Sequence, residues 1–191
     1  MALYQGVSGT LRVEHRVTSD HTAFEAFVRE SSTRLLRTAV LLCGDRAEAE
    51  DLVQDAYTTA FRRWRLVSHA DNPVAYVRRI LSRTYLNDRR RRGVDHQSVE
   101  LREMSAEGGG STRPATYAEH VEAQSAATRL TLLDALATLP ALDRAVLVAR
   151  YWEDLSTAEV AAMLNLTEGA CRTRASRALA RLRRHFPELE D

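Results

Sequence analysis

The sequence contains no lysine, so its 27 strongly basic residues are all arginines. It has only two cysteines, Cys43 and Cys171, which are far apart and belong to no Cys-x-x-Cys pair. A disulfide framework or a structural zinc site is therefore not indicated. GC-rich coding alone explains the absence of lysine, although the planar guanidinium also suits phosphates and guanine edges better than an ammonium group does.

Long apolar runs are also missing. No segment approaches the ~20 apolar residues that a membrane span requires. Residues 1–20 carry charges and no apolar stretch, unlike a signal peptide. The hydrophobic share of 45% and the charged share of 28% are typical of a folded, soluble chain rather than a disordered one. We therefore expect a cytoplasmic protein that does not insert into a membrane.

The net charge of +1 hides an uneven distribution. Seven arginines and a single acid, Asp88, lie between Arg78 and Arg92, and six arginines with no acid lie in 172–184. The segment 45–55 is the reverse, with five acids and one arginine. Two cationic blocks and one anionic block favour two contacts with nucleic acid and one with a different partner.

Helical periodicity runs through most of the chain, and no strand-like alternation is present. The segment 93–125 contains three successive glycines and Pro114, which indicates a flexible linker. We therefore predict an all-α fold with two small helical domains, over 21–92 and 126–187, preceded by a loose tail over 1–20. Helices are predicted over 21–43, 45–64, 72–91, 127–139, 141–152, 157–164 and 168–185.

The strongest local signal lies in the second domain. Ser156 and Glu159 match the S-x-x-E capping box that opens a helix. Asn165 follows at the position of a sharp turn, where asparagine tolerates the left-handed conformation, and Thr167 can cap the next helix. This pattern predicts a helix-turn-helix, whose second helix enters the DNA major groove. Its candidate base-reading residues are Arg172, Thr173, Ser176 and Arg177, and its candidate phosphate contacts are Arg181 and Arg184.

The helix over 72–91 mixes aromatic and amide side chains with arginines. This combination suits single-stranded DNA, because unpaired bases stack on rings while cations hold the backbone. An ordinary helix with a core tyrosine and a solvated basic end would look similar. The candidate residues are Tyr76, Arg79, Ser82, Arg83, Asn87 and Arg90.

The helix over 45–64 carries the acids. Glu48 and Glu50, near its start, are explained by the helix dipole, which favours negative charge there by ~0.3–1 kcal/mol each. Asp55 lies beyond the first turns, where that effect fades. Asp51, Gln54 and Asp55 are therefore a candidate protein-binding face.

These segments together resemble a known family. The run Ala47-Glu-Ala-Glu-Asp-Leu-Val-Gln-Asp-Ala-Tyr, the run from Asn72 to Ile80, and the stretch from Leu136 through the helix-turn-helix are similar to regions 2 and 4 of bacterial sigma factors. The likeness covers about 24–92 and 126–185 in the right order. Without the extra domains of housekeeping sigma factors, it resembles the extracytoplasmic-function (ECF) type.

The resemblance implies partners and roles. Asp51, Gln54 and Asp55 would contact the β′ clamp helices of core RNA polymerase, and the second domain would also meet the β flap. The helix over 72–91 would melt and capture the promoter −10 strand, and the last helix would read the −35 element. One position departs from the family, since Arg83 stands where many relatives have asparagine, so the −10 preference is not carried over. Whether an anti-sigma factor inhibits the protein stays open.

Two other readings compete with this one. A stand-alone helix-turn-helix regulator would bind promoters without polymerase, but two separate basic elements and no evident dimerisation helix argue against it. An enzyme is disfavoured, since the six histidines cluster with no nucleophile and no Gly-rich phosphate loop is present. We therefore expect no catalytic residue, no metal site and no cofactor.

Overall fold

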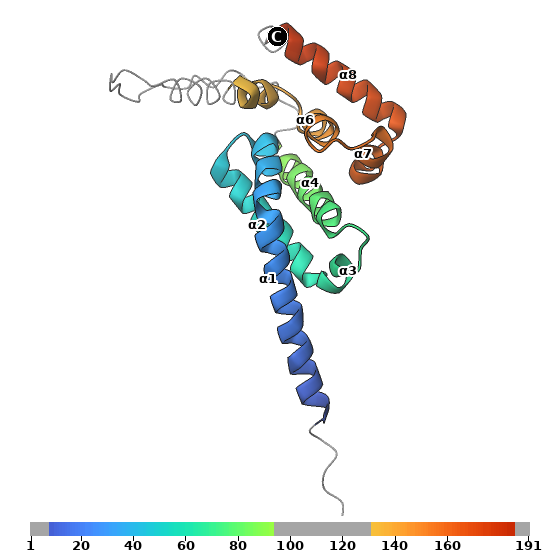
Figure 1. The fold of residues 1–191 in the computed structure, drawn as a ribbon. Helices are drawn as coiled ribbons and strands as arrows, with labels where there is room; N and C mark the ends of the chain where they lie inside the picture. Colours follow the sequence, from blue (N-terminus) through green and yellow to red (C-terminus); the bar gives the residue numbers. More distant parts are fainter. Residues whose placement is uncertain (1–7, 94–130, 186–191) are drawn as a thin grey trace, which may run out of the picture.

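The structure, a computed structural model, describes residues 8–93 and 131–185, and every regular element in these ranges is helical (Figure 1). The all-α prediction is confirmed. The predicted linker over 93–125 lies outside the described residues apart from Gly93. The first group of helices is α1 (Ser8–Cys43), α2 (Arg46–Arg62), α3 (Trp64–Ser68) and α4 (Pro73–Arg91). The second group is the helix 131–137, α6 (Ala141–Leu147), the π-helix η2 (Val148–Trp152), α7 (Thr157–Leu164) and α8 (Glu168–His185).

The N-terminal end of α1 corrects one prediction. We expected a loose tail over 1–20, but the helix already begins at Ser8. Between Gly9 and His21 the sequence has no glycine or proline. Once a helix is nucleated, each further residue adds one hydrogen bond at low cost, so a segment without breakers continues it even without apolar periodicity.

Most helix boundaries follow the predicted signals. Gly44, with φ of 80°, ends α1, and its N–H donates to the Val40 carbonyl over 2.8 Å. Asp45 caps α2 by accepting from the Glu48 N–H over 2.8 Å, and Asn72 caps α4 in the same way. The helix predicted over 45–64 instead stops at Arg62 and restarts as α3.

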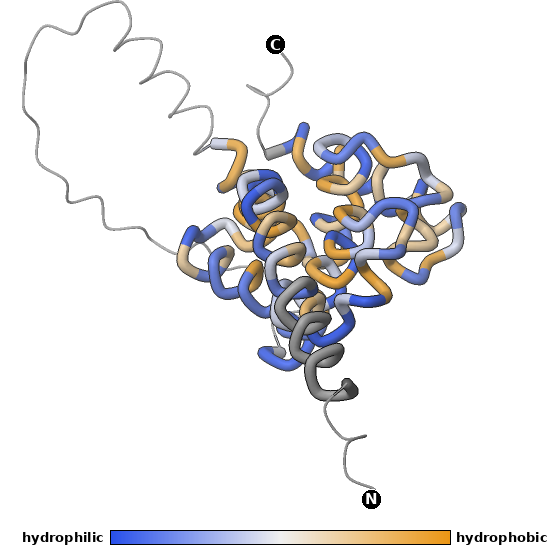
Figure 2. Tube along the Cα trace, turned by 60° about the horizontal axis from the view of Figure 1, so that its bottom comes forward, coloured by the Kyte–Doolittle hydropathy of each residue, from blue (hydrophilic) through white to orange (hydrophobic). Residues whose placement is uncertain are grey.

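The first domain packs α1, α2 and α4 around a common core. Ala49, Ala56 and Ala60 are fully buried on α2, and their small side chains let α1 and α4 approach closely. Further along α1, Phe24 packs edge-on against Trp64 with ring centroids 5.1 Å apart. Figure 2 shows the hydrophobic positions turned inward between the helices and the polar positions turned outward.

The two groups of helices also pack against each other. The C-terminal part of α1 contacts α6 and η2, and α4 contacts α6 and α7, as Figure 1 shows. Their buried apolar side chains form one continuous cluster. The chain therefore has two helical domains that share a boundary in this structure.

Candidate nucleic-acid interface

The loop from η2 to α8 folds as the sequence predicts. The Ser156 N–H donates to the Glu159 carboxylate over 2.8 Å, and the Glu159 N–H donates to the Ser156 hydroxyl over 3.2 Å, so the capping box is complete. Hydrogen bonding to the carboxylate from the Ser156 side chain, and next from the Ser156 N–H, favours its ionised form and lowers the pKa of Glu159. Asn165 adopts the left-handed conformation, with φ of 58° and ψ of 48°. The Thr167 hydroxyl accepts from the Ala170 N–H over 3.1 Å and opens α8.

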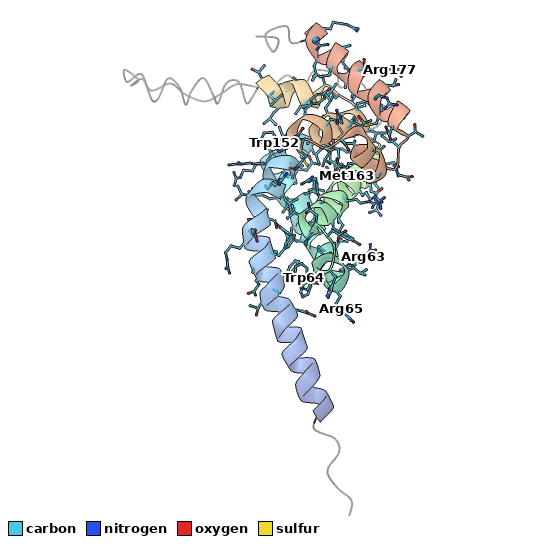
Figure 3. The ribbon with its side chains drawn as sticks, turned by 45° about the vertical axis from the view of Figure 1, so that its right-hand side comes forward. Arg63, Trp64, Arg65, Trp152, Met163 and Arg177 are labelled. Carbon is cyan, nitrogen blue, oxygen red and sulfur yellow. The ribbon has the colours of Figure 1, made fainter. Side chains whose placement is uncertain are left out.

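Helix α8 divides into a buried face and an exposed face. Cys171, Ala175 and Ala178 are buried and hold the helix against α6 and α7. Figure 3 shows Arg177 on the outer side of α8. Arg181 is half-buried, and its Nε is enclosed without a hydrogen-bond partner. The predicted residues that are exposed on α8 are Arg172, Thr173, Ser176, Arg177 and Arg184.

Helix α4 exposes most of its predicted residues. Arg79, Arg83, Asn87 and Arg90 are exposed, whereas Tyr76 is half-buried. Ser82 departs from the prediction, because only 4% of it is exposed. It lies one turn beyond the buried Arg78, on the inward face of the helix. Ser82 therefore drops out of the candidate set in this arrangement.

Several arginines serve contacts within the protein, which the sequence did not predict. Arg89 and Arg92, from the basic end of α4, pair with the Glu48 carboxylate at 2.8 and 2.6 Å. The Arg89 guanidinium also lies 5.4 Å from the centre of the Tyr85 ring. Glu48, which we expected to act on the helix dipole alone, thus fastens α2 to α4. Partners this distant in the chain leave no local sequence signal.

The predicted protein-binding face on α2 is accessible. Asp51, Gln54 and Asp55 are all exposed. They line a polar cleft that Asp88 and Arg89 of α4 complete. The face is thus an acidic surface beside the paired end of α4, and nothing in the first domain covers its carboxylates.

The two cysteines are buried free thiols. Burial, aided by the nearby Glu48 carboxylate, raises the pKa of Cys43 to about 12, and burial also raises the pKa of Cys171. Both therefore act as core residues at neutral pH. Within residues 8–93 and 131–185, no group of three or more His, Cys, Asp or Glu side chains is placed to hold a metal ion.

Comparison with known proteins decides the family. Residues 27–94 match the model for sigma-70 region 2, and residues 129–182 match the model for sigma-70 region 4. The RNA polymerase sigma-E factor of Streptomyces coelicolor is 34% identical over 160 residues, which are 84% of each chain. The chain belongs to the sigma-70 family. As the resemblance indicated, it is a sigma factor of the ECF type, which directs promoter-specific initiation of transcription.

Two further comparisons support the sigma factor's assignment and its fold. The ECF RNA polymerase sigma factor SigL of Mycobacterium tuberculosis is 30% identical over 178 residues, which are 93% of this chain and 97% of SigL. The solved structure of the sigma factor RpoE from Bartonella quintana, in complex with the anti-sigma factor NepR, shares the fold, with a TM-score of 0.59 and 22% identity. The likeness covers 85% of this chain and 95% of that one.

Members of the family bind core RNA polymerase and promoter DNA, and they are generally non-catalytic initiation factors. None of the sigma factor's helices within the described ranges has the length and hydropathy of a membrane span.

Proposed function

We propose that the two arginine-rich helices divide promoter recognition between them, with α8 on the −35 duplex and α4 on the −10 strand. The observation that best supports this proposal is the exposed polar face of α8, the helix that follows directly on the Asn165 turn. Early residues of a recognition helix reach base edges, so Arg172, Thr173, Ser176 and Arg177 read the −35 sequence. Arg181 and Arg184, one to two turns later, hold phosphates.

The exposed residues of α4 suit a melted strand. Tyr76 offers a ring on which a base can stack, and Asn87 offers an amide for hydrogen bonds with a base edge. Arg79, Arg83 and Arg90 hold the backbone by charge. Arg83 stands where an uncharged amide would read a base, so its guanidinium shifts this position from base reading toward backbone contact.

The acidic surface of α2 is the proposed site for core polymerase. Asp51, Gln54 and Asp55 face solvent and would meet a basic surface on the β′ clamp helices, while the second domain meets the β flap. The chain between the two domains, 93–125, can extend to ~100 Å at 3.3–3.6 Å per residue. Promoter elements two helical turns apart are separated by ~70 Å, so the reach is sufficient. Such a protein works at the chromosome, in the cytoplasm, and without catalysis of its own.

A gel shift with and without core polymerase tests this function. Each domain alone offers a short cationic surface whose DNA affinity falls steeply with salt. Polymerase holds both domains on one DNA, which raises their effective concentration. We expect weak binding by the free protein at physiological salt and tight binding by the holoenzyme, which a promoter with a scrambled −35 element abolishes. Tight, sequence-specific binding by the free protein would instead favour a stand-alone regulator.

A further inference from the structure

The boundary between the two domains contains a buried acid. Glu153 follows η2 in the second domain, and only 2% of its side chain is exposed. Its three partners all come from the first domain. The Arg34 and Arg78 guanidinium groups lie 2.9 and 3.1 Å from its Oε2, and the Thr38 hydroxyl donates to its Oε1. One carboxylate of the second domain thus pairs with two cations of the first.

A second polar contact crosses the same boundary. The Arg144 guanidinium of α6 donates to the Leu42 carbonyl, at the end of α1, over 2.7 Å. It also donates to the Ala137 carbonyl of its own domain over 2.9 Å. Burial lowers the pKa of Arg144. Polar contacts of this kind fix one arrangement of the domains, because each group needs its partner once water is excluded.

In this arrangement the helices α4 and α8 lie too close together for the proposed function, on which the present inference rests. Helix α7 contacts α4 on one side and α8 on the other. It is about 12 Å long, and packed helices lie about 8–10 Å apart. The start of α8 is therefore within about 30 Å of the part of α4 that α7 contacts. Promoter elements ~70 Å apart cannot be reached by both helices at once.

We propose that the structure is a closed state of the free protein, latched by Glu153, and that the latch opens when the protein assembles with polymerase. The desolvation of two charges offsets most of their attraction, so a buried ion pair specifies a geometry more than it stabilises it. The closed state is accordingly reversible. Opening returns Glu153 to water and frees Arg78, which lies next to Arg79 on the proposed −10 helix.

The distance between the domains of the free protein tests the latch. Leu66 is 65% exposed in the first domain, and Ala180 is exposed on α8. Dyes on Leu66→Cys and Ala180→Cys report the separation by energy transfer, with both native thiols buried. We expect high transfer in this reporter and a marked fall after Glu153→Gln. The matched control is Asp143→Asn, since Asp143 pairs with Arg174 at 2.7 Å within the second domain; its transfer should not change.

A second variant guards against misfolding of the first. Arg34 is 58% exposed. Arg34→Ala therefore removes one of the two cationic partners of Glu153 by a change at the surface, and we expect an intermediate fall in transfer. Circular dichroism verifies that each variant keeps its helices. Low transfer in the unmutated reporter would overturn the closed state. Unchanged transfer in both latch variants would overturn the role of Glu153.

Polymerase binding then separates this inference from the proposed function. If only open molecules bind polymerase, the apparent affinity for polymerase equals the affinity of the open state multiplied by the fraction of molecules that are open. With ~0.1–10% of molecules open, Glu153→Gln should bind core polymerase about tenfold more tightly or better. A fall in transfer with unaltered affinity would show that polymerase does not need the open state and would overturn the proposed opening. If no variant binds polymerase, the proposed function fails while the transfer result still decides the latch.

Discussion

The helices α4 and α8 are both rich in arginine, but they use their arginines differently. On α4, Arg78 is buried against Glu153, and Arg89 and Arg92 pair with Glu48 of α2. On α8, the pair between Arg172 and Glu168 is an exposed contact within one helix. The number of arginines in a helix therefore does not give the number available to DNA. Of the four arginines at the end of α4, 89–92, two hold α4 to α2 through Glu48. Helix α8, in contrast, presents most of its arginines to solvent.

The acids differ as well. The first domain adds an exposed acidic surface at Asp51 and Asp55, whereas the acids of the second domain that face its arginines are Asp143 and Glu168, each taken up by an ion pair. The first domain thus presents both signs of charge, and helix α8 of the second presents mainly positive charge, although Asp134, Asp154 and Glu159 are exposed elsewhere in that domain. We therefore expect the acidic surface of the first domain and helix α8 of the second to bind different partners.

Removal of the acidic surface on α2 should have the largest effect. Asp51→Arg with Asp55→Arg should abolish binding to core polymerase, because two repulsive charges replace two attractive ones. Both residues are exposed, so the melting temperature and circular dichroism should change little. Glu30→Arg with Asp71→Arg makes the same change of charge at other exposed sites of this domain and serves as the control. An unchanged affinity in a core-enzyme titration would refute the role of this surface.

The second prediction compares two arginines of α8. Arg177→Ala should relax discrimination at one −35 position by ~1–3 kcal/mol, because a bidentate contact with a base edge is lost. Arg184→Ala should weaken binding to all sequences alike and lower the salt slope by about one unit. Holoenzyme binding to a library of −35 variants distinguishes them. A uniform loss for Arg177→Ala would mean that α8 docks on the DNA in another way.

The third prediction compares two arginines of α4. Arg89→Ala should lower the free energy of unfolding by about 1–2 kcal/mol, because it leaves the half-buried Glu48 with one partner fewer and removes the contact with Tyr85. Arg83→Ala should leave stability within about 0.5 kcal/mol but slow promoter opening. Urea denaturation and permanganate footprinting of the −10 region measure the two effects. Equal stability of both variants would contradict the structural role of Arg89.

The smallest expected effect concerns the helix caps, one in each domain. Asp45→Ala and Ser156→Ala should each cost about 1 kcal/mol, because each removes the acceptor of an N-terminal N–H. Since the domains share a core and the Glu153 contact, each variant should shift the same single melting transition. Two transitions, each responding only to its own cap, would show that the domains unfold independently.

The sequence was sufficient for features that depend on neighbours in the chain. The capping box at Ser156, the left-handed Asn165 and the cap at Asn72 each rest on residues a few positions apart, and all are present. The resemblance to sigma factors also rests on such local runs. Features that depend on distant partners were missed. Glu153 is an ordinary acid in the sequence, and only the fold shows that it meets Arg34 and Arg78.

The same limit applies to Ser82, which this arrangement buries. Polar side chains next to arginines suggested an exposed face, but the position of Ser82 one turn after Arg78 makes it share the side of α4 that is buried. Periodicity alone left this choice open, because α4 is surrounded by neighbours on more than one side. The roles of Asp51, Gln54 and Asp55 stay predictions, since exposure alone does not identify a partner.

The π-helix η2 determines where Glu153 points. The Glu153 N–H donates to the Val148 carbonyl over 3.1 Å, five residues back instead of the four of an α-helix. A π-turn thus holds one residue more than an α-turn, and one residue corresponds to about 100° of rotation around the axis. If the same residues formed regular α-helix, Trp152 would take that place, and the Glu153 carboxylate would turn away from Arg34 and Arg78. The closed arrangement therefore depends on the wider π-turn, which brings the fifth residue after Val148 to the place that the fourth would take in an α-helix.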